Sequence, residues 1–322
     1  MVSARARLAA AAPAVLAALA LASSPASAGA PRPALVAHVE GEINSVTASY
    51  VAGAVGQAGR DGASALVLVI DTPGGYSAAM DDITKSLLGS PVPTIAFVYP
   101  PGARAASAGL FVAQACDLVA MAPGTNIGSA HPISSTGGDI GGDLGVKVLN
   151  DAVARIRNLA TAHGRNADWA ESAVRQSVNV GTSDAVRLHV ADFEAANLGE
   201  LLDAADGRTL PRPDGRSLTV STAGAGLEDL PMSPVQVGLH ALVDPNVAYL
   251  LMLVAAFGLI AEITSPGAIL PGVVGGISAV LALVALSSLP LNLAGVLLML
   301  LAFLLFLADI KAQTHGILTA GG

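Results

Sequence analysis

Apolar residues between positions 34 and 121 fall into short blocks separated by longer segments of mixed character. The blocks at 34–43, 65–71, 94–99 and 118–121 predict strands, and 65–70 is apolar throughout. Unbroken apolar character of this kind is typical of a strand buried on both faces of a parallel sheet. The intervening and following segments predict helices at 47–59, 78–88, 107–115, 147–163, 169–176 and 183–189, and a mobile glycine-rich loop at 137–145.

Strands that alternate with helices indicate an α/β domain with a mostly parallel sheet, and we place this domain at residues 29–203. The pattern then changes at 204–243. This stretch contains two Asp-Gly turn signals and four prolines, which favour a linker.

Three apolar segments with almost no charge follow the predicted linker, at 247–263, 268–286 and 291–307. Each is near the length needed to cross a bilayer, and Ser-Pro-Gly and Ser-Ser-Leu-Pro turns separate them. We therefore predict an all-α transmembrane domain of three helices at 244–322. Glu262, near the end of the first segment, is interpreted as an interfacial residue rather than as a functional membrane carboxylate.

The N-terminal 28 residues have the pattern of a secretory signal peptide. Arg5 and Arg7 precede an apolar stretch at 8–21, and Ala26-Ser27-Ala28 forms a cleavage site. Cleavage after Ala28 places the α/β domain outside the cytoplasm.

Composition narrows the range of functions. Hydrophobic residues make up 53% of the 322 residues and charged residues 12%, with the apolar excess at the two ends. The net charge of −8 and the absence of a basic block argue against a nucleic-acid partner. Cys116 is the only cysteine, which excludes an intrachain disulfide and a cysteine-rich zinc site. With no phosphate-binding loop and no ligand cluster, we expect neither cofactor nor metal.

Candidate chemistry centres on Ser107, which is flanked by Ala106, Ala108 and Gly109. Nothing bulky covers its hydroxyl, and a helix can begin just after it. Upstream, the sequence Asp-Thr-Pro-Gly-Gly at 71–75 forms a glycine turn after a buried strand. A small-residue serine and a glycine-rich bed of N–H donors are what acyl transfer requires, so the sequence favours a hydrolase.

Several motifs in this order carry a family resemblance. They are DTPGG at 71–75, PPGARAASAG at 100–109, MAPGTNIG at 121–128, AHP at 130–132, GRN at 164–166, and in the apolar region DPN at 244–246, SPG at 265–267, PG at 271–272 and LP at 289–290. With these motifs the chain resembles the NfeD family of membrane-bound serine proteases, which are ClpP-class hydrolases fused to transmembrane helices. The resemblance runs from about residue 35 to the C-terminus, and it implies a ClpP/crotonase-like fold for the α/β domain. Longer members of the family continue with another membrane segment and a small soluble β-barrel domain.

The resemblance implies a serine–lysine dyad, with Ser107 as the nucleophile and Lys147 as the base. The oxyanion hole would consist of the backbone N–H groups of Gly75 (or Gly74) and Ala108. General chemistry agrees, because a serine hydroxyl needs a nearby base and a lysine can be that base only when neutral, a form that burial among apolar groups favours. Lys147 lies between two valines and is one of only three lysines.

Alternatives remain for each residue. Lys147 could be an exposed lysine at a loop edge, and Ser107 a small residue required for helix packing. His131, oriented by Asp117 or Asp139, offers a histidine base instead of the lysine.

The sequence thus predicts a membrane-bound, multi-pass serine endopeptidase that cleaves extracytoplasmic or membrane-proximal polypeptides through an acyl-enzyme. The resemblance implies self-association, at least to a dimer, and substrates among the apolar segments of stomatin-like membrane proteins. Two other functions remain open: a non-catalytic membrane scaffold that partners stomatin-like proteins, and a crotonase-like acyl-CoA enzyme, against which secretion argues because coenzyme A is cytoplasmic.

Overall fold

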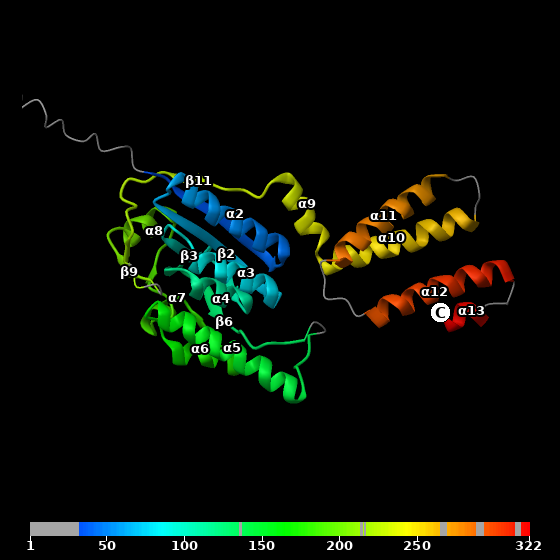
Figure 1. Ribbon diagram of the computed structural model, residues 1–322, viewed down its shortest axis with the longest axis horizontal. Coiled ribbons are helices and arrows are strands. Elements are labelled where there is room, and N and C mark those ends of the chain that lie inside the picture. The colour runs from blue at the N-terminus through cyan, green and yellow to red at the C-terminus, as the bar shows by residue number, and fades with distance from the viewer. Residues whose placement is uncertain are drawn as a thin grey trace, which may run out of the picture.

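The computed structural model describes residues 32–134, 137–212, 215, 217–264, 269–287, 293–312 and 317–322. The predicted signal peptide lies outside these residues. An α/β domain and a group of apolar helices lie on opposite sides of the molecule (Figure 1).

A parallel sheet forms the centre of the α/β domain. Its strands are β1 (Ala34–Ile43), β2 (Ala65–Gly75), β3 (Thr94–Val98) and β5 (Leu118–Met121), paired in that order. The short strand β8 (Phe193–Glu194) continues the sheet beyond β5. The end of β2 also pairs with β4 (Arg104–Ala106), which leads through β6 (Asn126–Gly128) to β7 (Asn179–Gly181).

Helices cover both faces of this sheet. Buried side chains of one face pack against α2 (Ser45–Asp61), α3 (Ser77–Leu88), α4 (Ala108–Ala115), α5 (Gly142–Ala162) and α6 (Ala167–Arg175), while α7 (Thr182–Arg187) contributes Ala185 to the same cluster. The other face packs against α8 (Leu198–Ala205). The α/β fold class is therefore confirmed. The helix predicted at 147–163 begins earlier, at Gly142, so residues 142–145 of the predicted glycine-rich loop are helical.

The predicted linker is largely part of the folded domain. It forms the hairpin β9 (Thr209–Pro211) and β10 (Ser217–Thr219), the edge strand β11 (Leu227–Asp229) and the helix α9 (Pro234–Leu242). β11 pairs in parallel with β1, and Leu210 and Val220 are buried beside α8. The prediction of a linker was wrong here because proline and glycine mark the turns of short elements as readily as they mark an unfolded segment.

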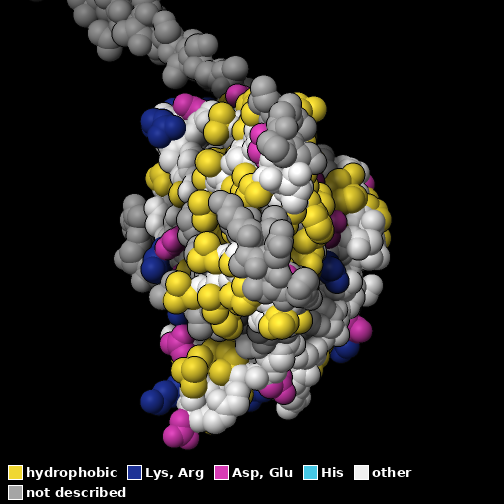
Figure 2. Space-filling view, turned by 90° about the vertical axis from the view of Figure 1, so that its right-hand side faces the viewer, with side chains coloured by type: hydrophobic (Ala, Val, Ile, Leu, Met, Phe, Trp, Pro, Cys, Tyr) yellow, Lys and Arg dark blue, Asp and Glu magenta, His cyan; other side chains and the backbone are white. Residues whose placement is uncertain are grey.

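The C-terminal region is helical, as predicted. Its helices are α10 (Pro245–Thr264), α11 (Ile269–Ser287), α12 (Leu293–Ala312) and a short α13 (Ile317–Gly321) that the sequence did not predict. Figure 2 shows the molecule from the side on which these helices lie. Hydrophobic side chains spread over the middle of this face, and charged side chains lie mostly toward its margin. Among the described residues, α10 alone is long and apolar enough to cross a bilayer.

The first two apolar helices form a closely packed hairpin. A Cβ on Gly258 would come within 2.8 Å of the Gly275 Cα, so only glycine permits this approach of the two backbones. At the end of the pair where the chain passes from α10 to α11, the Glu262 carboxylate accepts a hydrogen bond of 3.2 Å from the Gly272 N–H in the first turn of α11. This contact gives Glu262 a structural role, because a carboxylate at a helix N-terminus is stabilised by the helix dipole.

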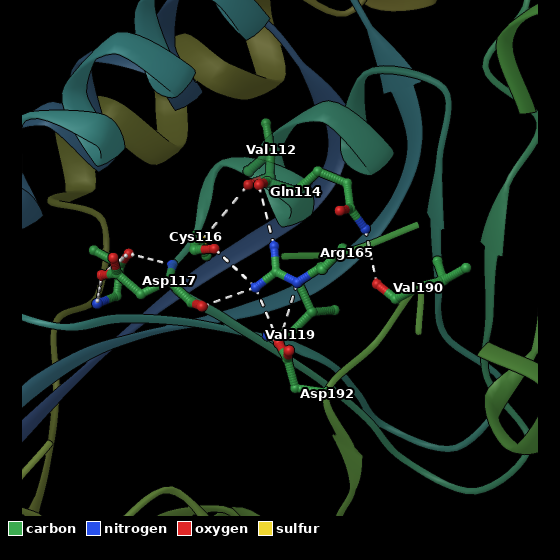
Figure 3. Close-up of polar contacts among 9 residues, drawn as sticks. Val112, Gln114, Cys116, Asp117, Val119, Arg165, Val190 and Asp192 are labelled. Atoms are coloured by element: carbon green, nitrogen blue, oxygen red, sulfur yellow. Dashed lines mark hydrogen bonds and ion pairs between the residues drawn. The ribbon is translucent and has the colours of Figure 1, made fainter. Parts of the chain in front are cut away.

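A buried polar network holds the C-terminal end of α4 (Figure 3). The Arg165 guanidinium donates to the carbonyls of Gln114, Cys116 and Asp117 at 2.9–3.2 Å, and it pairs with Asp192 at 2.9 Å. Arg165 thereby satisfies carbonyls that have no partner within the helix and supplies a positive charge at the negative end of its dipole.

A second buried pair lies beside this network. Arg212, from the segment after β9, pairs with Asp117 at 2.7 Å, and Asp117 also accepts hydrogen bonds from the Thr94 backbone and hydroxyl. Arg165 joins the segment after α5 to the end of α4 and to Asp192. Arg212 joins the segment after β9 to Asp117, which in turn is bonded to Thr94 at the start of β3.

Replacing Arg165 tests this anchoring. We expect Arg165→Met to lower the free energy of unfolding by about 3–5 kcal/mol, because it leaves Asp192 and three carbonyls without their buried partner. Arg187→Met is the control, since Arg187 pairs with Asp184 on the exposed surface and a surface pair contributes little. Chemical denaturation of the full chain in detergent micelles measures both, and equal effects would contradict the assigned role.

Candidate active site

Ser107 occupies a sharp turn between strand β4 and helix α4. Its backbone has φ 54° and ψ −119°, a conformation that costs free energy for any residue other than glycine. Two backbone hydrogen bonds of 3.0 Å hold the turn, one from Ser107 N–H to the Gly128 carbonyl and one from Leu110 N–H to the Ser107 carbonyl. The turn places the half-buried serine at the start of α4, the position that a nucleophile on a strand-to-helix elbow occupies.

Two glycines make room for this turn. A Cβ on Gly74 would lie 2.5 Å from the Ser107 Cβ, and a Cβ on Gly109 would lie 2.5 Å from Thr72 Cγ2. Rotation of the Thr72 side chain would break two hydrogen bonds, because its hydroxyl donates to the Gly41 carbonyl at 2.6 Å and accepts from the Gly74 N–H at 3.0 Å. The DTPGG and ASAG motifs therefore fit together sterically.

The predicted site residues lie around one cavity of about 380 Å³. Ser107, Lys147, Gly75 and Ala108 all line it. Gly74 does not, and its N–H already donates to Thr72. The remaining walls are mostly apolar or small, from Met80, Phe111, Ala130, Pro132, Val148 and Ala152.

The two N–H groups proposed for the oxyanion hole differ in origin. Ala108 is the first residue of α4, and N–H groups of a first helical turn have no partner within the helix. Gly75 pairs with Ile43 in register, and the next residue, Tyr76, donates its N–H to the Ile43 carbonyl. Because N–H groups alternate in direction along a strand, the Gly75 N–H points away from β1.

The expectation that Lys147 is buried among apolar groups is wrong for one copy of the chain. Lys147 is exposed, on the second turn of α5, and its neighbours Leu144 and Val146 are 64% and 59% exposed. The reason is that the buried residues of α5 begin only at Val153, so the first turns project past the domain core (Figure 1). Ile133, in the preceding segment, adds a third exposed apolar side chain.

The cavity also contains an ion pair that was not predicted from the sequence. Arg155 of α5 pairs with Asp81 of α3 and with Asp151, and all three residues line the cavity. The contact of Arg155 with Asp81 links two helices, α3 and α5, that both line the cavity. The i, i+4 spacing of Asp151 and Arg155 could have indicated their pairing, but the contact to Asp81 spans 74 residues and has no local signal.

His131 is placed differently from the other candidates. Its Nδ1 is 3.0 Å from the Val174 carbonyl and its Nε2 is 3.8 Å from Asp139, and it is not among the residues that line the cavity. Asp117, the other suggested partner of His131, is buried against Arg212 and Thr94. This arrangement gives a histidine base no support.

Two family models match the chain. The NfeD1b N-terminal domain matches residues 34–202, and the NfeD integral membrane domain matches residues 246–322. The chain therefore belongs to the NfeD family, in which this α/β domain is joined to an integral membrane domain.

Among curated proteins, the chain is 35% identical over 291 residues to the membrane-bound protease PH1510 of Pyrococcus horikoshii, a match that covers 89% of this chain and 66% of that protein. It is 26% identical over 246 residues to the membrane protein NfeD1b of Bacillus subtilis, covering 76% of this chain and 54% of that protein. The chain thus spans less than two thirds of the length of each relative.

Two solved structures show the same α/β fold. One is a serine-to-alanine mutant of the 1510-N membrane-bound stomatin-specific protease, 35% identical, with a TM-score of 0.60 over 63% of this chain and 100% of that one. The other is a lysine-to-alanine mutant of that protease in complex with a substrate peptide, 33% identical, with a TM-score of 0.62 over 66% of this chain and 98% of that one.

The close approach at Gly109 predicts a sensitive position. We expect Gly109→Ala to lower the free energy of unfolding by about 1–3 kcal/mol, because the new methyl group overlaps Thr72 in a packed core. Gly53→Ala is the control, since Gly53 lies in helix α2 with no atom near its added Cβ, and alanine there should stabilise by roughly 0.5–1 kcal/mol. Denaturation of both variants in detergent measures the difference, and a neutral Gly109→Ala would refute the steric argument.

Proposed function

We propose that this chain is a membrane-bound serine endopeptidase that acts through an acyl-enzyme on Ser107. The observation that carries the proposal is that a serine in a strained turn, a lysine and two backbone N–H groups line one cavity. Two further facts support it. The family relative PH1510 is a membrane-bound protease, and the structures similar to this domain carry alanine in place of one serine and one lysine that are about forty residues apart, as Ser107 and Lys147 are here.

The proposed reaction uses Lys147 in its neutral form. The Ser107 Oγ attacks the scissile carbonyl carbon while Lys147 Nζ takes the hydroxyl proton. The N–H groups of Gly75 and Ala108 donate to the resulting oxyanion. When the C–N bond breaks, Lys147 returns the proton to the leaving amine, and a water molecule activated by the same lysine then hydrolyses the acyl-enzyme. We assign no role in the oxyanion hole to Gly74, whose N–H has a partner.

Because Lys147 is exposed, the active state requires that apolar groups cover it. A protonated lysine in water is a poor base, and covering it with apolar groups favours the neutral amine. Leu144, Val146 and Ile133 supply an apolar rim around it that a polypeptide substrate or a second copy of the chain would cover. We therefore propose that the protease self-associates, at least to a dimer, through this domain.

We further propose the location and the class of substrate. The family's membrane domain and the predicted signal peptide favour a multi-pass membrane protein in contact with lipid, with its protease domain on the extracytoplasmic side. The similar solved structures are of a stomatin-specific protease, and the mostly apolar cavity suits apolar segments of stomatin-like membrane proteins.

Removing the nucleophile is the first test. We expect Ser107→Ala to reduce hydrolysis of a quenched fluorogenic peptide of apolar residues by about 10⁴-fold or more, because no acyl-enzyme can form. Ser129→Ala is the matched control, since Ser129 also has a positive φ, of 51°, but does not line the cavity. Turnover at the wild-type rate by purified, folded Ser107→Ala protein would exclude this serine as the nucleophile.

Replacing Lys147 shows whether it acts as a base or only supplies a positive charge. Lys147→Arg should be as inactive as Lys147→Ala, because arginine keeps the charge but does not lose its proton near neutral pH. His131→Ala should retain activity in the same peptide assay. If Lys147→Arg remains active and His131→Ala does not, the base is the histidine.

A further inference from the structure

Helix α9, residues Pro234–Leu242, has an unusual distribution of polar side chains. The sequence PVQVGLHAL contains no charged residue, and Gln236 and His240 carry its only polar side chains. The helix is well defined, because Ser233 and Gln236 form a reciprocal capping box and Pro234 occupies its first position. It lies between the two family models, which end at 202 and begin at 246, so neither gives it a role.

The two polar residues lie on the side of α9 that faces the α/β domain. They are four positions apart and therefore share one helix face. His240 Nδ1 is 3.1 Å from Nδ2 of Asn44, a buried residue that caps helix α2. Gln236 accepts a hydrogen bond of 2.9 Å from the Ser233 N–H.

Apart from the partly buried Leu242, the larger apolar side chains of α9 are exposed. Val235, Val237 and Leu239 are 71%, 55% and 40% exposed, and no residue of the helix is buried. A helix on a soluble protein has the opposite arrangement, with its apolar stripe toward the core and its polar face toward water. α9 therefore needs an apolar environment on its outer side.

The position of α9 in the chain identifies that environment. α10 begins at Pro245, three residues after α9 ends, and it is the candidate membrane span. A helix that ends three residues before a membrane span lies close to the bilayer surface, and Figure 1 shows α9 between the α/β domain and α10. With nine residues, α9 is too short to cross the bilayer itself.

We propose that α9 lies in the interface of the lipid bilayer, with Val235, Val237 and Leu239 in contact with lipid and with His240 and Asn44 joining it to the α/β domain. An interfacial helix of this kind holds the domain at a fixed height and orientation on the membrane. Asn44 directly follows Ile43, which pairs with Gly75 at the cavity, so the attachment point is close to the candidate active site.

Site-directed fluorescence on the full chain in phosphatidylcholine vesicles tests the proposal. Val235→Cys and Leu239→Cys are each labelled with an environment-sensitive nitrobenzoxadiazole probe, and the only native cysteine, Cys116, is fully buried. Phe257→Cys on exposed α10 is the membrane control, and Asp203→Cys on α8 is the water control. Quenching by phosphatidylcholine with a doxyl group on its acyl chain is then compared with quenching by aqueous iodide.

We expect the probes at 235 and 239 to show blue-shifted emission and doxyl quenching comparable with that at 257, and the probe at 203 to be quenched by iodide only. Iodide quenching at 235 and 239 equal to that at 203 would overturn the proposal. Protection of both positions from both quenchers would also overturn it, because a second copy of the chain would then cover the helix. The readout does not depend on proteolysis, so it stands or fails separately from the proposed activity.

Discussion

The backbone turn at Ser107 is the constraint on which the candidate site depends. Its left-handed conformation is strained, and it persists because its surroundings leave no alternative. The Gly128 carbonyl accepts a hydrogen bond from the serine N–H. Gly74 and Gly109 have no Cβ, which would otherwise clash with Ser107 and Thr72. Each of these contacts comes from a different segment of the chain, so the turn depends on the packing of β2, β6 and α4 against one another.

Buried arginine side chains hold the C-terminal end of α4 in place. Arg165 donates to three carbonyls there, and Asp117, at the start of β5, pairs with Arg212 from the β9 hairpin. A helix of eight residues that carries a strained turn at its beginning and a buried guanidinium at its end has little freedom to move. Rigid support of this kind is what an oxyanion hole requires, because its N–H donors must be in place before charge develops.

The sequence predicted those parts of the molecule that local chemistry determines. Small residues around Ser107 and the glycines at 74 and 75 indicated a tight turn, and unbroken apolar runs indicated a parallel sheet. It did not predict that residues 204–243 fold onto the domain, since that depends on long-range contacts such as the pairing of β11 with β1 and the ion pair of Arg212 with Asp117. The exposure of Lys147, which the sequence left open as an alternative, could not be decided for a related reason: neighbouring valines suggest burial, but whether a helix turn is covered depends on the whole assembly.

Outside the apolar helices α10 to α12, the described residues include two exposed apolar surfaces, the rim beside Lys147 and the outer side of α9. They differ in the partner that suits them, because the rim adjoins Lys147, which lines the cavity, and α9 precedes the first apolar helix. Together they support the proposal of a protease domain that works close to the membrane on apolar polypeptides.

Fluorophosphonate labelling of the full chain in membranes, followed by mass-spectrometric mapping of the modified peptide, tests whether Ser107 is a nucleophile activated within its cavity. We expect a single covalent adduct on Ser107. An adduct on another serine, or peptide hydrolysis by protein in which Ser107 remains unmodified after complete labelling, would contradict it.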